Sequence, residues 1–236
     1  MGDKMPSISG SSARRGAAAA PIKLQRAATL VANSYKKSRN HGSLTADVDI
    51  PFDEGDVQAL LMNNRTLLIP GSNSVWDYIK FNFRPFNIGG KKYSFKTQTT
   101  GEKIGHIWHQ GFLAHAMAVH AKFDQKRPNL IIGHSLGAAS AQVLSMIWDV
   151  PAICFAAPRV YLGGGAIGDK NKCLCIVLED DPVRNLPTNK FDYVGDVRPL
   201  GKNNLFRMKH RMSHYEKAVM DPAIKSKLPD QWPSAT

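Results

Sequence analysis

A serine between two glycines is the feature of this sequence with the clearest chemical meaning. Ser135 is the centre of a Gly-x-Ser-x-Gly pattern that runs from Gly133 to Gly137. A short apolar run precedes the pattern and an Ala- and Leu-rich stretch follows it, which predicts a strand, a sharp turn and a helix. Such a turn strains the central residue and exposes its hydroxyl, and the glycines let strand and helix approach closely. We therefore interpret Ser135 as a nucleophile that accepts an acyl group.

A serine hydroxyl is a weak nucleophile at neutral pH, so it needs a base, an orienting acid and an oxyanion hole. In hydrolases with this turn, the order along the chain is serine, acid, histidine. Asp181 closely follows the apolar run 174–178, at the end of a predicted strand, where α/β active sites assemble. Asp180 is its nearest rival, and Asp192 and Asp196 are weaker candidates.

Two histidines, His210 and His214, follow these carboxylates. They are four residues apart, so in a helix they would share one face. The spacing also suggests a pair of metal ligands, but the intervening Glu of a His-Glu-x-x-His motif is missing and no third ligand accompanies them. The sequence therefore favours a histidine base over a metal site, and it implies no metal and no cofactor.

The oxyanion hole requires two hydrogen-bond donors close to the nucleophile. One expected donor is the backbone N–H of Leu136, the residue after Ser135, and the other belongs on a loop that follows an earlier strand. The sequence Pro70-Gly71-Ser72 ends such a strand. Gly71 permits an unusual turn, and Ser72 offers both an amide and a hydroxyl. We predict Ser72 and Leu136 as the oxyanion-hole residues.

These residues must be held by a framework of alternating strands and helices. Continuous apolar runs are typical of central parallel strands covered on both faces, and i, i+3, i+4 spacing indicates amphipathic helices between them. The pattern predicts an α/β fold with a central, mostly parallel sheet flanked by helices. The predicted elements are a helix beginning after Pro21, a hairpin of 57–62 and 66–69, a helix from Ser74, a strand over 93–95, helices over 111–123 and 137–148, and strands over 152–155 and 174–178.

The chain of 236 residues has the length of one α/β domain. Residues 1–20 are rich in Ser, Gly, Ala and Arg, which predicts a disordered basic leader before a single domain over 21–236. The three cysteines, Cys154, Cys173 and Cys175, are too few for a disulfide framework, and we expect them to be buried in central strands.

The formal net charge of +12 favours anionic partners. A lipid or membrane interface fits this charge better than nucleic acid does, because the basic residues are scattered and no nucleic-acid-binding motif accompanies them. No apolar stretch approaches the ~20 residues that span a bilayer, and no segment has the apolar core of a signal peptide. These features favour a cytoplasmic location.

Motifs along positions 57 to 215 resemble, in the right order, those of the class 3 lipases, the filamentous-fungal type of α/β-hydrolase. The closing motif favours His210 over His214 as the base, and the motif around the acid favours Asp181 over Asp180. Pro70 stands where this family has an arginine. The matching segments are GHSLGAA (133–139), IPGSNSVWDYI (69–79), HQGF (109–112), FAAPRV (155–160), DPVRNLP (181–187), YVG (193–195) and HRM (210–212).

The resemblance implies an α/β-hydrolase fold, a catalytic triad of Ser135, Asp181 and His210, and a lipid ester as substrate. It also implies a short lid, which here corresponds to the aromatic segment 74–86. With the basic charge, phospholipids and monoacylglycerols become candidate substrates beside triacylglycerols. An acyltransferase or thioesterase with the same triad, or a lipid-binding frame without activity, are the alternative functions.

Overall fold

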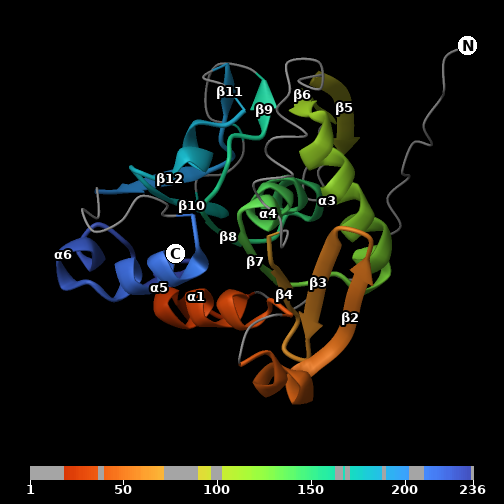
Figure 1. Ribbon diagram of the computed structural model, residues 1–236. Coiled ribbons are helices and arrows are strands. Elements are labelled where there is room, and N and C mark those ends of the chain that lie inside the picture. Colours follow the sequence, from red (N-terminus) through yellow and green to blue (C-terminus); the bar gives the residue numbers. More distant parts are fainter. Residues whose placement is uncertain are drawn as a thin grey trace, which may run out of the picture.

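A seven-stranded sheet forms the centre of the computed structural model, which describes residues 19–36, 40–71, 90–96, 103–162, 167, 171–187, 190–201 and 210–234. The strand order is β12-β10-β8-β7-β4-β3-β2 (Figure 1). Neighbouring strands from β12 to β4 are parallel, whereas β3 and β2 are antiparallel to their neighbours. The strands are β2 (Val48–Glu54), β3 (Val57–Met62), β4 (Thr66–Ile69), β7 (Leu130–His134), β8 (Ala152–Phe155), β10 (Cys173–Leu178) and β12 (Asp196–Leu200).

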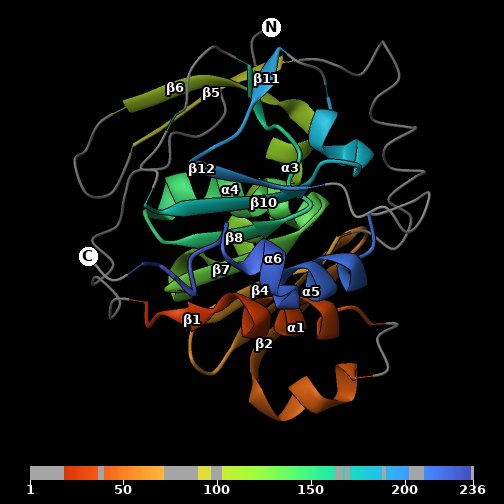
Figure 2. The ribbon, with the colours of Figure 1, turned by 90° about the vertical axis from the view of Figure 1, so that its left-hand side faces the viewer.

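Helices cover both faces of this sheet (Figure 2). Helices α3 (Gln110–Phe123) and α4 (Leu136–Trp148) lie on one face, and α1 (Leu24–Asn33) and α5 (Met212–Met220) on the other. Every residue of α4 is buried, because this helix lies between the sheet and α3. Each face therefore has its own hydrophobic core. The short helix α6 (Pro222–Lys225) follows α5.

The predicted hairpin is confirmed, and it brings two functional segments together. Strands β3 and β4 pair antiparallel around a turn in which Arg65 has a φ of 67°. Strand β4 then pairs parallel with β7, with Ile69 opposite Gly133. The carboxyl ends of these two strands are therefore adjacent. Gly71, two residues beyond β4, consequently lies beside the turn that carries Ser135.

Two smaller sheets complete the fold. A four-stranded antiparallel sheet has the order β11-β9-β6-β5, and a two-stranded ribbon of β1 and β13 joins segments from the two ends of the chain. No helix of the described part is long and apolar enough to cross a membrane. The remaining elements are β1 (Ile22–Lys23), β5 (Gly90–Lys96), β6 (Lys103–His109), β9 (Tyr161–Leu162), β11 (Phe191–Asp192), β13 (Gln231–Trp232) and the 3-10 helices η1 (His41–Asp47), η2 (Asp124–Lys126) and η3 (Pro182–Asn185).

Most predicted elements within the described residues are confirmed, including the helix after Pro21 and the strand around 93–95. The three cysteines are buried and free, as expected. Strands β2 and β12 were not predicted. The predicted helix from Ser74 and nearly all of the predicted leader lie outside the described residues.

Candidate active site

Ser135 occupies the sharp turn between β7 and α4. Its φ of 58° and ψ of −121° lie in a region that residues with a side chain rarely adopt, so the backbone is strained there. The flanking glycines make the turn possible. A Cβ at Gly133 would lie 2.4 Å from the carbonyl oxygen of Gly137, and a Cβ at Gly137 would lie 2.0 Å from that of Ile69. The close approach expected from the sequence is therefore present.

A continuous line of hydrogen bonds runs from Ser135 through His210 to Asp181. The Ser135 Oγ lies 2.7 Å from His210 Nε2. His210 Nδ1 lies 3.1 Å from Asp181 Oδ1 and 3.0 Å from Oδ2. All three side chains are buried. With Nδ1–H donating to the carboxylate, Nε2 has a free lone pair to accept the serine proton.

Asp181 is held in place by donors from two further elements. Its Oδ1 accepts the backbone N–H of Val183 at 2.9 Å, and its Oδ2 accepts the hydroxyl of Tyr215 at 2.7 Å. The Tyr215 oxygen in turn accepts the N–H of Leu178 at 3.2 Å. Burial, and next the charge of Asp181, raise the pKa of Tyr215 well above its usual value, so the hydroxyl keeps the proton it donates. Sequence reasoning missed Tyr215, which lies five residues after His210.

The other candidates for the base and the acid lie in different environments from those of His210 and Asp181. His214 lies within α5 and is partly exposed. His210 and His214 do not lie on one helix, because Arg211 is extended and the helix begins only at Met212. Asp192 accepts the backbone N–H of Tyr193, and Asp196 pairs with Arg198. Asp180, next to Asp181, is partly exposed.

Of the two predicted oxyanion donors, the structure describes one. Leu136 is the first residue of α4, and the N–H groups of the first helical turn have no partner within the helix. The Leu136 N–H follows directly on the Ser135 turn, where the prediction requires it. Ser72 lies outside the described residues. Its neighbour Gly71 packs against Ser135, since a Cβ there would lie 2.8 Å from Ser135 Cβ.

Tyr35, just after α1, holds this Gly71 turn. Its hydroxyl oxygen accepts the N–H of Gly71 at 2.8 Å and lies 2.5 Å from His134 Nδ1. Burial, and next the charge of His210, lower the pKa of His134 well below its usual value. A neutral His134 can accept at Nδ1, so the Tyr35 hydroxyl donates to it. Sequence reasoning missed Tyr35, which braces the Gly71 turn.

Two histidines that precede Ser135 in the chain, His109 and His115, make hydrogen bonds that hold helices in place. His109 accepts the N–H of Phe112 at the start of α3. His115 lies 2.6 Å from the Ser140 hydroxyl, which links α3 to α4. Burial lowers the pKa of both His109 and His115 to about 4. These residues are therefore neutral parts of the framework.

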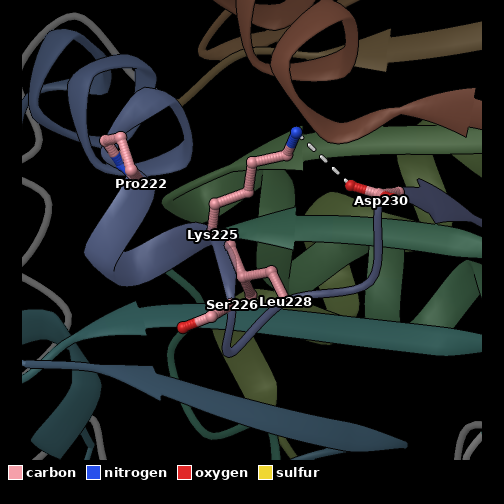
Figure 3. A pocket seen from close by; sticks show the side chains of 5 residues that line it. All are labelled: Pro222, Lys225, Ser226, Leu228 and Asp230. Atoms are coloured by element: carbon pink, nitrogen blue, oxygen red, sulfur yellow. Dashed lines mark ion pairs between the residues drawn. The ribbon is translucent and has the colours of Figure 1, made fainter.

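A surface hollow lies elsewhere, between α6 and the segment leading to β13 (Figure 3). An ion pair of 3.5 Å between Lys225 and Asp230 spans it. None of its lining residues belongs to the Ser135 network. The lining residues are Pro222, Lys225, Ser226, Leu228 and Asp230.

No protein-family model matches the chain, and no curated protein matches it in sequence. Solved structures do match it. It is similar to Lip2 lipase from Yarrowia lipolytica, with 15% identity, a TM-score of 0.54 and coverage of 75% of this chain and 77% of that one. It is also similar to a mutant form of MDLA from Penicillium cyclopium (17% identity, TM-score 0.51, coverage 81% and 84%) and to a lipase from Rhizopus microsporus var. chinensis (16%, 0.50, 85% and 83%).

At sequence identities of 15–17%, this structural similarity establishes the fold alone. The chain has the α/β-hydrolase fold of these lipases, with a mostly parallel central sheet of seven strands flanked by helices. The fold expected from the sequence is confirmed.

Proposed function

We propose that the chain is a serine carboxylic-ester hydrolase that acts on acyl lipids, with Ser135, His210 and Asp181 as its catalytic triad. The observation that carries the proposal is the buried line of hydrogen bonds through these side chains, with 2.7 Å between Ser135 Oγ and His210 Nε2. The strained turn at Ser135 and the fold shared with lipases support it.

In the proposed reaction, Ser135 Oγ attacks the ester carbonyl carbon while His210 Nε2 takes the hydroxyl proton. The charge that develops on the carbonyl oxygen is stabilised by the N–H of Leu136 and, as the second donor, by Ser72. His210 then gives its proton to the departing alcohol, leaving an acyl group on Ser135. A water molecule, deprotonated by His210, releases the acid. Asp181 keeps the imidazole oriented and stabilises its charged form throughout.

The substrate class is part of the proposal. The structurally similar proteins that are named as lipases support an acyl lipid. The net charge of +12 supports an anionic lipid interface as the place of action. Phospholipids and monoacylglycerols are therefore included beside triacylglycerols.

The direct test combines turnover with covalent labelling. We expect the full chain to hydrolyse p-nitrophenyl esters of graded chain length and to be labelled by a fluorophosphonate probe. Ser135→Ala should lose about 10⁶-fold in kcat and all labelling. Ser140→Ala, which alters a buried serine of the same helix, should keep both. Full activity in Ser135→Ala would sink the proposal.

Product analysis separates hydrolysis from acyl transfer. With an alcohol acceptor present at moderate concentration, the proposed hydrolase releases mainly free fatty acid. A dominant ester product would instead assign the same triad to an acyltransferase.

A further inference from the structure

Three buried cysteine side chains lie close together on two neighbouring strands of the central sheet. Cys154 lies on β8, and Cys173 and Cys175 lie on β10. Cys175 is the strand partner of Cys154, and Cys173, two residues earlier, lies on the same face. Their three Sγ atoms all lie within 4.8 Å of one another, and those of Cys154 and Cys173 are 3.7 Å apart. All three residues have no exposed surface.

The segment Tyr193 to Gly195 closes over this cluster. The Cys175 thiol donates to the carbonyl oxygen of Val194 at 3.5 Å, and the Val194 N–H is held by the Gln142 side chain at 3.0 Å. Gly195 has a φ of 84°, and a Cβ there would lie 2.2 Å from the carbonyl oxygen of Cys173. The backbone of this segment therefore packs tightly against the cysteine residues, and a side chain at position 195 would prevent this packing.

Although the sulfur atoms are close together, the strand positions of the closest pair do not suit a disulfide bond. The closest pair, Cys154 and Cys173, are diagonal neighbours across two strands. Neighbouring strands lie about 4.8 Å apart and two residues rise about 6.6 Å along a strand, so diagonal positions are about 8 Å apart, beyond the Cα separation that a disulfide usually bridges. A shared ligand placed between all three sulfurs needs no such movement of the backbone.

The spacing fits a metal ion. Metal–sulfur bonds of about 2.3 Å in a trigonal plane put the sulfurs about 4.0 Å apart. This value lies between the 3.7 Å of the closest pair and the 4.8 Å limit of the cluster. Among the described residues, no His, Asp or Glu completes the set. Zinc prefers four ligands, whereas soft copper(I) is stable with three sulfur ligands.

We propose that Cys154, Cys173 and Cys175 form a buried three-sulfur site for copper(I). Binding replaces S–H bonds by Cu–S bonds, and each thiol that becomes a thiolate releases one proton. No electron is transferred. A single thiolate with Cu⁺ is neutral, which removes the cost of a buried charge.

The test measures copper on the full, reduced chain. Copper(I), buffered with bicinchoninate without oxygen, is added to the folded protein and, separately, during refolding from denaturant. We expect about one Cu(I) per chain after desalting, a thiolate-to-copper absorption band, and a higher Tm. Zinc(II) offered in the same way should be lost on desalting. Copper absent after both loadings, or zinc retained in preference, overturns the proposal.

Variants locate the site. Cys154→Ala, Cys173→Ala and Cys175→Ala should each weaken copper binding at least ~10-fold. Val177→Ala truncates a buried side chain on the same face of β10 and should bind copper as the unaltered chain does. Should a cysteine variant fail to fold, X-ray absorption of the unaltered chain decides the question. Three sulfurs at about 2.3 Å support the site, and nitrogen or oxygen ligands overturn it. This proposal does not depend on the proposed hydrolase function.

Discussion

Two hydrogen-bonded networks lie next to Ser135, and each contains a tyrosine hydroxyl. One runs through His210 and Asp181 to Tyr215 of α5. The other runs from Gly71 through Tyr35, just after α1, to His134. We call them the acid network and the turn network. The acid network contains a carboxylate and faces the serine hydroxyl, whereas the turn network is neutral and holds backbone. In the proposed enzyme, we therefore expect the first network to control proton transfer and the second to control the geometry of the turn.

The largest effect should come from breaking the acid network at its base. In His210→Gln, no group remains to take the serine proton, so we expect kcat to fall by about 10⁵–10⁶-fold. His214→Gln is the matched control, because His214 is partly exposed within α5, and it should change kcat less than about 3-fold. Turnover of a short-chain p-nitrophenyl ester measures both. The opposite ranking would move the base to His214.

Removing the charge of the acid network should be the next largest effect. Asp181→Asn keeps the shape of the side chain but favours the wrong imidazole tautomer, so we expect kcat to fall about 10⁴-fold. Asp180→Asn, one residue away, should retain activity within about 3-fold. The two variants are compared by steady-state kinetics. Equal losses would show that the acid network extends to Asp180.

The two tyrosines compare the networks directly. We expect about a 10-fold loss of kcat in both Tyr215→Phe and Tyr35→Phe, because each removes a hydrogen bond that positions a residue or turn beside Ser135. Each variant also leaves a buried N–H without its acceptor, which should lower the free energy of unfolding by about 1–3 kcal/mol. The pH–rate profiles should differ. Tyr215→Phe removes a donor from Asp181, so more negative charge remains beside the imidazole and the acid limb moves to higher pH.

Tyr35→Phe should leave the acid limb of the pH–rate profile unchanged, since this substitution changes only the position of the Gly71 turn. A shifted acid limb in Tyr35→Phe, or an unshifted one in Tyr215→Phe, would contradict the division of roles between the two networks. Circular dichroism confirms that both variants are folded.

The smallest effect concerns the neutrality of three buried histidines, of which His134 belongs to the turn network. Burial lowers the pKa of His134 well below 6.5, and that of His109 and His115 from 6.5 to about 4. Below pH 6.5, these histidines bind protons in the unfolded chain but stay neutral in the folded chain. The stabilisation they provide is therefore present above pH 6.5 and is lost as the pH falls towards 4.

Each such histidine should contribute up to about 1.4 kcal/mol per pH unit to the free energy of unfolding over this range. Urea titrations at several pH values measure the slope. His115→Gln, outside both networks, removes one titrating group and should lower the slope by one histidine's share. An unchanged slope would show that His115 is protonated in the folded chain.

The parts of the site that could be predicted are those marked by local sequence. Backbone sterics make the glycines around Ser135 necessary, and an acid directly after a buried strand is confined to the carboxyl edge of the sheet. Asp181 and His210 could be proposed for this reason and through the order of motifs. The spacing of His210 and His214 could not decide whether they share a helix, because it does not show that Arg211 is extended.

The missed parts depend on contacts between distant residues. Tyr35 is 36 residues from Gly71 and 99 from His134, and its position after an amphipathic helix suggests only packing. Strands β2 and β12 contain Pro51 and Pro199 among charged residues, a pattern typical of loops. Both are edge strands of the seven-stranded sheet, where proline is tolerated because one side lacks a hydrogen-bonding neighbour.

The contact of Gly137 with the carbonyl of Ile69, and of Gly71 with Ser135, joins the nucleophile and the neighbouring turn into a single rigid part. Neither backbone can move closer to the other without a collision. We therefore expect regulation of the proposed enzyme to act on how a substrate reaches Ser135, since the two segments beside it are already in close contact.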